Sequence, residues 1–459
     1  MLEKLRVVFS IPELRQKIFL TLFLLAVYRI GYHVRLPVLT NVDLAMSGDM
    51  QAFLNKVALF SATDLSSLTI FGLGIAPYIS ASIIFQLLGT VWAPIEQLRK
   101  EGAVGRKKIN EYTRYLTVVI CVIQSWAYLQ FSVVSVEDST VSSVFHSGTQ
   151  LSFGWVVTTV TIMTAGSMFL MWLGEQIDEY GIGNGVSLLI MAGILAQMPK
   201  ALWDLRQNMT SDLSGLSANT IGPDVLIVLA FLFIGVVFAV VFITMAQRRI
   251  QMQSAKHVRG RRVFGGTKQF LPLKINQSGV MPIIFASSML MIPGLVFGVF
   301  ANFFASGEDA GSGWSGAMAT MFSGLSNMFS SQSSFSYNVL YVVFIFFFCF
   351  FWTSIMFNPK EMSQNLQDSG AFIPGYRPGK RTADYLEKVM VRITYVGAAF
   401  LAVVAIVPTI ITSQFGVSYT VAAFYGGTGL LIAVSVAFDL IQKIDSHLLM
   451  RNYKGLLEQ

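Results

Sequence analysis

The chain has 459 residues, of which 54% are hydrophobic and only 12% are charged. Soluble domains carry about 25% charged residues. A mean hydropathy of +0.62 over this length would leave large apolar patches facing water if the chain were soluble. The composition therefore excludes an ordinary water-soluble protein and indicates that a bilayer surrounds most of the chain.

The residue types that carry catalysis and metal binding are sparse and scattered. Cys121 and Cys349 lie inside apolar runs, and none of the four histidines has the spacing of a helical metal site. The polar connections offer no compact set of aspartate, glutamate and histidine. We therefore expect no catalytic residue, no metal site and no cofactor, and we do not expect an enzyme.

Ten apolar runs are long enough to be membrane spans, because a hydrocarbon layer about 30 Å thick needs about 20 helical residues. The predicted spans cover approximately residues 18–36, 68–91, 115–134, 153–173, 182–199, 225–246, 279–301, 338–357, 393–413 and 419–438. The first run is too long for a signal-peptide core and lacks a small-residue cleavage site. Residues 1–17 are therefore predicted to be an amphipathic cytosolic segment.

Lysine and arginine are concentrated in alternate connections. The segments that hold 27 of the 32 basic residues are 1–17, the connection between the second and third spans, the loop 247–274, the loop 358–392 and the tail 439–459. The connections after the third, seventh and ninth spans hold none. By the positive-inside rule, both termini are predicted to be cytosolic.

Within the predicted spans, lysine, arginine, histidine, aspartate and glutamate occur only in the later part of the first span, as Arg29, His33 and Arg35. Proton-coupled transporters need buried carboxylates, histidines or lysines near the middle of the bilayer. We therefore expect a dry, apolar interior with interrupted helices. A secondary transporter of a small solute, which is also built from broken helices, is the alternative.

Two spans begin with glycine-rich interruptions. Gly72, Gly74 and Pro77 interrupt the second span. Irregular backbone at membrane depth must be covered by protein or line a cavity, whereas a proline near a first turn also suits a simple helix cap. The local sequence leaves both interpretations open. The fifth span begins with GIGNG at 181–185, which indicates a tight turn with an asparagine cap.

The loop 247–274 carries eight lysines or arginines and no acidic residue. Membrane topology alone explains such a charge, but the loop is longer than a simple connection needs. A docking surface for an acidic or phosphate-rich partner, such as RNA, is the better interpretation. The later sequence GYRPGKRT, 375–382, imitates a phosphate-binding loop but has one residue too few between its glycines. We interpret it as a rigid turn that presents Arg377.

Several long motifs, in order, resemble the SecY family, whose members form the protein-conducting channel of the bacterial translocase. They are IFGLGIAPYISASIIFQLL (70–88), GRKKINEYTRYLT (105–117), GIGNGVSLLI (181–190), QRRI, GRRVFGG and LPLKIN (within 247–276), GVMPIIFASS (279–288), FIPGYRPGK (372–380) and YGGTGLLI (425–432). The resemblance covers nearly the whole chain.

The resemblance implies an all-α polytopic membrane protein, with ten transmembrane helices in two inverted five-helix halves around an hourglass pore. The first half would cover 18–199 and include a plug at about 59–70, and the second half would cover 200–438. The pore would also open sideways to lipid between the second and seventh spans. The implied function is a channel that translocates unfolded polypeptides across the bacterial cytoplasmic membrane and releases membrane segments into lipid.

The family's functional positions carry over to matching residues. The pore ring would consist of Ile75, Ile79, Val186, Ile190, Ile284 and Ile432. The plug and its hinge would include Phe60, Ser61, Asp64, Gly72 and Gly74. The lateral gate would place Ser82 and Gln86 opposite Ser287 and Ser288. Docking of a motor or a ribosome would use Arg248, Arg249, Arg261, Arg262 and Arg377.

The implied partners are the small membrane subunits SecE and SecG, the motor ATPase SecA, the ribosome with its rRNA, signal sequences, nascent polypeptides and membrane lipid. Two features depart from the family pattern. The plug sequence FSATDLSSLTI lacks the glycine-rich start and basic residue that relatives usually carry, and Gly429 stands where serine is common. The first departure bears on how tightly the plug seals the pore, and the second bears on the stiffness of the last span.

Overall fold

The computed structural model describes residues 11–36, 69–134, 146–147, 150–151, 153–207, 223–254, 257–259, 262–264, 268–305, 314–330, 334–415 and 428–457. The chain divides into two compact units. The first contains residues 1–204 and 436–459, and the second contains residues 205–435. The predicted plug residues Phe60, Ser61 and Asp64, and the predicted docking residue Arg261, lie outside the described residues.

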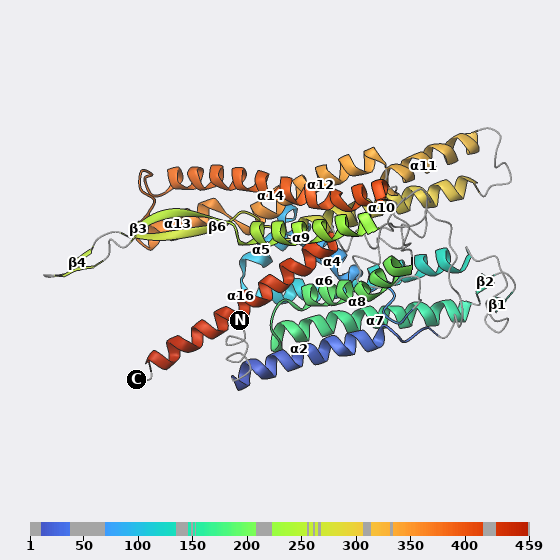
Figure 1. Cartoon of the computed structure of the whole chain (residues 1–459), viewed down its shortest axis with the longest axis horizontal. Helices are drawn as coiled ribbons and strands as arrows, with labels where there is room; N and C mark the ends of the chain where they lie inside the picture. The colour runs from blue at the N-terminus through green and yellow to red at the C-terminus, as the bar shows by residue number, and fades with distance from the viewer. Residues whose placement is uncertain are drawn as a thin grey trace. The chain divides into compact units, whose positions relative to one another are not determined.

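The first unit is built from helices that follow one another along the chain (Figure 1). They are α2 (Pro12–Gly31), α4 (Ala76–Val91), α5 (Ala93–Lys100), α6 (Ala103–Val134), α7 (Phe153–Tyr180), most of α8 (Gly185–Gln207) and the later part of α16 (Thr428–Leu457). The short strands β1 (His146–Ser147) and β2 (Gln150–Leu151) pair between α6 and α7. Pro12, Pro77 and Pro94 each lie in a first turn, where a missing N–H leaves no helical hydrogen bond unmade.

The second unit combines helices with a small antiparallel sheet. Its helices are α9 (Pro223–Met245), α10 (Met281–Ala305), α11 (Trp314–Ser330), α12 (Phe335–Met356), α13 (Pro359–Asp368), α14 (Lys380–Phe415) and the beginning of α16. Its strands are β3 (Gln247–Ser254), β4 (His257–Arg259), β5 (Arg262–Phe264), β6 (Lys268–Lys274) and β7 (Ala371–Phe372). The strand order is β6-β3-β7, and β4 pairs with β5 as a separate hairpin.

Each predicted span overlaps a helix among the described residues, and the predicted fold class is confirmed. By length and hydropathy, four helices among the described residues can cross a membrane: α7, α9, α12 and α14. The pair α4 and α5, bent by 96°, qualifies as a fifth. The count of ten spans therefore stays a prediction. α6 and α14 continue beyond the predicted spans into charged turns, and α16 continues through the segment predicted to be a tail.

The loop prediction for 247–274 was incomplete, because β3 and β6 form a seven-pair antiparallel ladder there. Alternation is visible in retrospect: Ile250 and Met252 are buried while Gln251 between them is exposed. Pro272 lies in β6, which is an edge strand where a residue without an N–H is tolerated. The helices α5, α11 and α13 were also not predicted.

Candidate channel elements and docking platform

An irregular segment precedes α4 at the predicted hinge. The N–H of Gly72 donates to the carbonyl of Thr69 at 2.9 Å, and the N–H of Gly74 donates to that of Phe71 at 2.8 Å. Gly74 has a φ of 57°, in the left-handed region of backbone conformation that residues with a Cβ rarely adopt. The chain therefore approaches α4 through consecutive turns rather than through continuous helix.

This irregular segment is covered by protein. Thr69, Phe71, Leu73 and Ile75 are 2%, 5%, 8% and 3% exposed. Thr69 forms a bridge with Arg35 after the end of α2. On α7, a Cβ added to Gly166 would overlap the backbone carbonyl of Ile70, so only glycine permits this close approach. The sequence left two interpretations of this segment open, a helix break covered by protein and a simple helix cap. The burial of the segment favours the break covered by protein.

The turn before α8 has the predicted asparagine cap. Asn184 Oδ1 accepts a hydrogen bond of 3.0 Å from the N–H of Ser187, which confirms that prediction. Asp178 Oδ1 also accepts a bond of 2.7 Å from the N–H of Gly185. A Cβ on Gly185 would overlap the backbone of Gly174, so α7 and α8 approach each other through two glycines. Asp178 was not predicted as a cap because it precedes the turn by several residues.

Two other helices hold the same turn in place. Thr21 Oγ1 of α2 accepts a hydrogen bond of 3.2 Å from the N–H of Ile182. Ile182 packs with Leu14 of α2, and Leu440 and Ile444 of α16 cover this pair. The turn that starts α8 is therefore fixed by α2, α7 and α16 together.

The predicted pore-ring residues share one structural feature, which is that each lies at the start of a helix. Ile75 is the residue that caps α4, and Ile79 donates its N–H to the Ile75 carbonyl at 3.1 Å. Val186 and Ile190 lie in the first turns of α8, Ile284 in the first turn of α10 and Ile432 in the second turn of α16. The pore-ring residues of α4 and α8 belong to the first unit, whereas Ile284 and Ile432 belong to the second. The ring as a whole stays a prediction.

The burial of these residues fits a protein-lined location. Ile75, Ile190, Ile284 and Ile432 are 3%, 4%, 4% and 1% exposed, whereas Ile79 and Val186 are half-buried. Side chains on the outer surface of a candidate membrane span are far more exposed, as the 58% for Ile227 in α9 illustrates. A lipid-facing position is therefore a poor description of the four buried residues.

The predicted lateral-gate residues lie on two helices. On α4, Gln86 Nε2 donates to Ser82 Oγ at 3.1 Å, and the buried Gln86 Oε1 has no hydrogen-bond partner in the described part of the chain. On α10, Ser287 Oγ donates to the carbonyl of Ile284 at 2.8 Å. Ser288 lies in α10 as well. Because α4 and α10 belong to different units, the pairing of these serines across a gate stays a prediction.

Charged groups in the first unit form a pair between two helices. Arg114 of α6 donates from Nε and Nη2 to the two carboxylate oxygens of Glu175 of α7, at 3.0 and 2.7 Å. This bidentate geometry fixes both side chains. Among the described residues, no group of three or more histidine, cysteine, aspartate or glutamate side chains could hold a metal ion.

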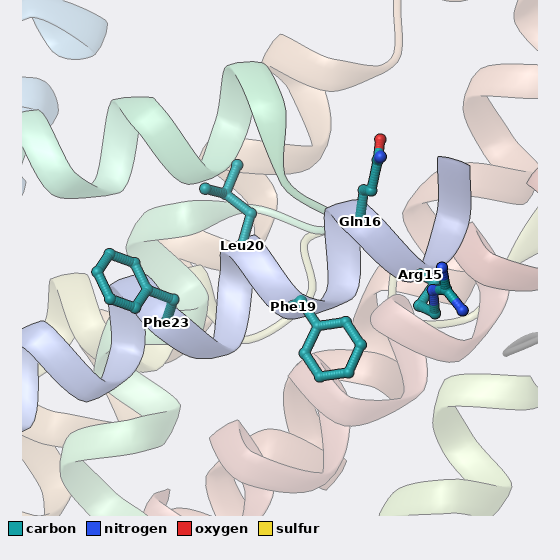
Figure 2. A pocket seen from close by; sticks show the side chains of 5 residues that line it. All are labelled: Arg15, Gln16, Phe19, Leu20 and Phe23. Carbon is teal, nitrogen blue, oxygen red and sulfur yellow. The ribbon is translucent and has the colours of Figure 1, made fainter. Parts of the chain in front are cut away.

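A shallow depression lies on the surface of α2 (Figure 2). Its lining comes from that helix alone and consists of Arg15, Gln16, Phe19, Leu20 and Phe23. Phe19 and Phe23 are 59% and 64% exposed. A single helix cannot enclose a small molecule, so we assign no ligand to this depression.

In the second unit, the described residues of the two basic loops form one body. We call it the platform and define it as the described residues within 247–274 and 357–393. Its core contains Ile250, Met252, Leu273, Phe357, Leu366, Ile373, Leu386, Val389, Met390 and Ile393. β3 also pairs with β7, with Gln253 opposite Phe372 and Ser254 opposite Ala371. In Figure 1, β3, β6 and α13 lie together at the end of this unit opposite α11.

Two adjacent docking residues predicted from the sequence lie on opposite faces of strand β3 in the platform. Successive side chains of a strand point to opposite faces. Arg248 is on the face of the buried Ile250 and Met252, whereas Arg249 shares the other face with Gln251. Both arginines are exposed, Arg248 because it lies near the strand end. Only Arg249 therefore belongs to the flat outer face of the sheet.

The ladder register adds three residues to that outer face. Lys274 pairs with Gln247, Phe270 with Gln251 and Lys268 with Gln253, so all three lie on the side of Arg249. Lys268 and Lys274 are exposed, and Phe270 is 57% exposed. A basic face with an exposed aromatic ring suits a protein or nucleic-acid partner. Arg262 lies opposite Arg259 in the β4-β5 hairpin.

The turn that carries Arg377 is tightly bonded. Gly375 and Gly379 have φ of 90° and 101°, which require glycine. Ser363 Oγ of α13 donates to the Gly379 carbonyl at 2.7 Å, and Thr382 Oγ1 donates to the Arg377 carbonyl at 2.9 Å. The side chain of Arg377 is exposed. The predicted rigid turn is therefore present.

These features define a polytopic helical membrane protein with an interrupted helix and a basic platform. The family model for SecY matches residues 69–441. "Protein translocase subunit SecY" of Streptomyces galbus is 40% identical over 458 residues, 98% of each chain. The protein of the same description from Chlamydia trachomatis serovar D is 40% identical over 467 residues, 99% of this chain and 98% of its own. The chain belongs to the SecY family.

Solved structures show the same fold. One described as "The structure of a protein conducting channel" has a TM-score of 0.61 and 19% identity, and the match covers 93% of this chain and 91% of that one. Another, described as "The plug domain of the SecY protein stablizes the closed state of the translocation channel and maintains a membrane seal", has a TM-score of 0.56 over the same shares.

Proposed function

We propose that the chain is a protein-conducting channel, which passes unfolded polypeptides across the membrane and releases membrane segments laterally into lipid. The family match over residues 69–441 carries this conclusion. The covered break before α4, with buried Ile75 at its end, supports it because irregular backbone inside a membrane suits a protein-lined passage. A secondary transporter is not favoured, because the family that matches this chain is that of a protein translocase subunit and not of a solute transporter.

The channel would close by an apolar ring of Ile75, Ile79, Val186, Ile190, Ile284 and Ile432. Branched aliphatic side chains offer an ion no replacement for its hydration shell, and narrow apolar constrictions gate by dewetting. The same side chains impose no specific partner on a passing polypeptide. Such a ring accepts many substrate sequences while it resists ions. In this mechanism the chain performs no catalysis itself.

The platform would dock the partner that drives transport. Arg249, Lys268 and Lys274 form a basic face, and Arg377 projects from a neighbouring turn. Long-range attraction to an acidic surface speeds association, and arginine adds fixed bidentate contacts to carboxylates or phosphates. We propose the motor ATPase SecA and the ribosome with its rRNA as the partners here, and SecE and SecG as the membrane subunits.

The proposed location is the bacterial cytoplasmic membrane, with both termini and the platform in the cytosol. The basic segments on alternate connections support this orientation. The proposed organisation keeps a first half at 18–199 and a second half at 200–438, with a plug at 59–70.

A reconstitution experiment tests the function. The chain, purified with its membrane subunits, is placed in phospholipid vesicles with the motor ATPase, ATP and an unfolded signal-bearing polypeptide. We expect the polypeptide to become protected from external protease, and a tightly folded version of it to stay exposed. Motor binding with no protected polypeptide would contradict the proposal, and ATP-independent uptake of a small solute would favour a transporter.

A further inference from the structure

The helix α11 turns back along α10. Ser326 Oγ of α11 donates a hydrogen bond of 3.1 Å to the carbonyl of Gly294 in α10. The ring of Phe322 stacks on that of Phe304, with centroids 5.6 Å apart and an interplanar angle of 3°. The ring of Phe329 lies 5.8 Å from that of Phe297. Later residues of α11 thus contact earlier residues of α10, so the two helices form an antiparallel hairpin.

The depth of this hairpin follows from the length of α10, which covers most of the predicted span 279–301 and is taken to cross the membrane on that basis. α10 has 25 residues and begins just after the platform, and at 1.5 Å per residue it is about 37 Å long. It exceeds a hydrocarbon layer of about 30 Å by only about 7 Å. Gly294 lies about 16 Å before its far end. Even if all the excess projects at that end, Gly294 and Ser326 lie within the hydrocarbon, so the last turns of α11 reach membrane depth.

The outward face of α11 carries a stripe of apolar and small residues beside the exposed polar residues Thr320, Ser323 and Asn327. Trp314, Met321 and Met328 are 81%, 50% and 46% exposed, and the exposed Ala317 and Gly324 lie between them. These positions recur every three or four residues, so they form one stripe along the helix. We call residues 314, 317, 321, 324 and 328 the methionine stripe. α11 contains no charged residue that could rim a water-facing interface.

The hydroxyl groups of the exposed Thr320 and Ser323 are bonded within α11. Thr320 Oγ1 donates to the carbonyls of Gly316 and Ala317, at 3.0 and 2.9 Å. Ser323 Oγ donates to the carbonyl of Thr320 at 2.9 Å. Hydrocarbon offers polar groups no partner, so polar groups placed there must be satisfied internally. These two exposed side chains already meet that requirement.

The surface next to α11 also exposes apolar side chains. α12, a candidate membrane span in contact with α11, exposes Val339, Val343 and Phe347 at 44%, 56% and 56%. α10 exposes Val296 and Phe300 at 44% and 46%. The methionine stripe therefore adjoins exposed apolar side chains of α10 and of the candidate span α12.

We propose that α11 is a half-immersed helix, in which Met321 and Met328 of the methionine stripe contact lipid acyl chains, in the leaflet on the far side of the membrane from the platform. Through the Ser326 bond and the stacked phenylalanines, it anchors the far end of α10 in that leaflet. This inference goes beyond the channel function and does not depend on it.

Spin-label accessibility tests the proposal. Met321→Cys and Met328→Cys are made in a full-length chain in which the buried Cys121 and Cys349 are replaced by alanine. Each variant is labelled in vesicles of phosphatidylethanolamine and phosphatidylglycerol, and collisions with oxygen and with a water-soluble nickel chelate are measured. Arg377→Cys serves as the water-exposed reference, and Phe347→Cys on α12 serves as the lipid-exposed reference.

We expect labels at 321 and 328 to resemble the label at 347, with high oxygen accessibility and nickel accessibility several-fold below that at 377. Oxygen concentrates in hydrocarbon, whereas the charged or polar chelate stays in water. Nickel accessibility equal to that at 377 would overturn the proposal and place the stripe in water. Low accessibility to both reagents would also overturn it, because a protein partner would then cover the stripe.

Discussion

Thr382 Oγ1 donates a hydrogen bond of 2.9 Å to the carbonyl oxygen of Arg377, five residues earlier in the chain. Thr382 is 2% exposed, whereas Arg377 is exposed. The ring of Tyr376 packs on that of Tyr385, with centroids 4.2 Å apart. The buried hydroxyl of Thr382 and the ring of Tyr385, both on α14, thus hold the backbone that presents the arginine.

The first prediction concerns Arg377 itself. Arg377→Glu should reduce motor-driven transport to background while protein level and membrane insertion stay normal, because the substitution reverses the charge at an exposed docking position. Transport into vesicles is the measurement. The matched control is Arg381→Glu, which changes an exposed arginine in the first turn of α14. Equal transport by the two variants would rule out a specific role for Arg377.

The second prediction concerns the support of that turn. Thr382→Val keeps the side-chain volume but removes the donor, so we expect binding of the motor to weaken by about 1 kcal/mol, roughly fivefold. Thr382→Ser should retain most of the affinity. Titration of the motor against the reconstituted channel gives both affinities. A valine variant that binds as tightly as the serine variant would show that the hydrogen bond does not position Arg377.

The third prediction concerns the pair between α6 and α7. Because Arg114 and Glu175 are partly exposed, with side chains at 47% and 27%, solvent screens their attraction. We expect a coupling free energy of about 0.5–1 kcal/mol, at the upper end for surface pairs because the contact is bidentate. Apparent thermal unfolding midpoints of Arg114→Gln, Glu175→Gln and the double variant measure it. Strictly additive midpoints would contradict the coupling.

The fourth prediction concerns the pore ring. Ile432→Asn places a hydrogen-bonding amide in a ring of aliphatic side chains, which should wet the constriction and favour the open state. We expect more export of substrates with weakened signal sequences and more resting ion leak. The paired variant Ile79→Asn tests the same ring from the first unit. If both variants keep wild-type export and leak, the ring assignment fails.

Ile227→Asn on the exposed side of α9 is the control for the fourth prediction. Ile227 is 58% exposed, so its substitution changes a lipid-facing side chain rather than the ring. We expect ion leak in this control to match the wild type. Leak raised equally in the control would indicate general damage to the membrane domain.

The fifth prediction concerns the plug. Thr69 pairs with Arg35, and the N–H of Ile70 donates to the Val34 carbonyl at 3.1 Å, so a clean deletion must leave both residues in place. Deletion of residues 62–67 should raise ion conductance in vesicles but leave the apparent unfolding midpoint close to wild type. The segment is rich in small and polar residues, which gain little from apolar packing. Unchanged conductance would count against a plug at this position.

Much of the membrane domain could be predicted because its signals are local. A charge-free apolar run of about 20 residues indicates a membrane helix wherever it occurs. The asparagine cap at 184 and the rigid turn at Arg377 also follow from short motifs, because glycine and asparagine set backbone geometry within a few residues. The ladder between β3 and β6 could have been found from the alternation around Ile250, but the strong basic charge of the loop concealed it.

By itself, the sequence determined the class of the protein, the positions of its helices and the sign of charge on its connections, because composition and periodicity act over one or two helical turns. Only the tertiary structure decided which distant segments meet. It paired Gln253 with Phe372, placed Arg249 and Arg248 on opposite faces, and brought Gly185 against Gly174. Such contacts depend on strand register and on the close approach of backbones, and a one-residue shift in register exchanges the two faces of a strand.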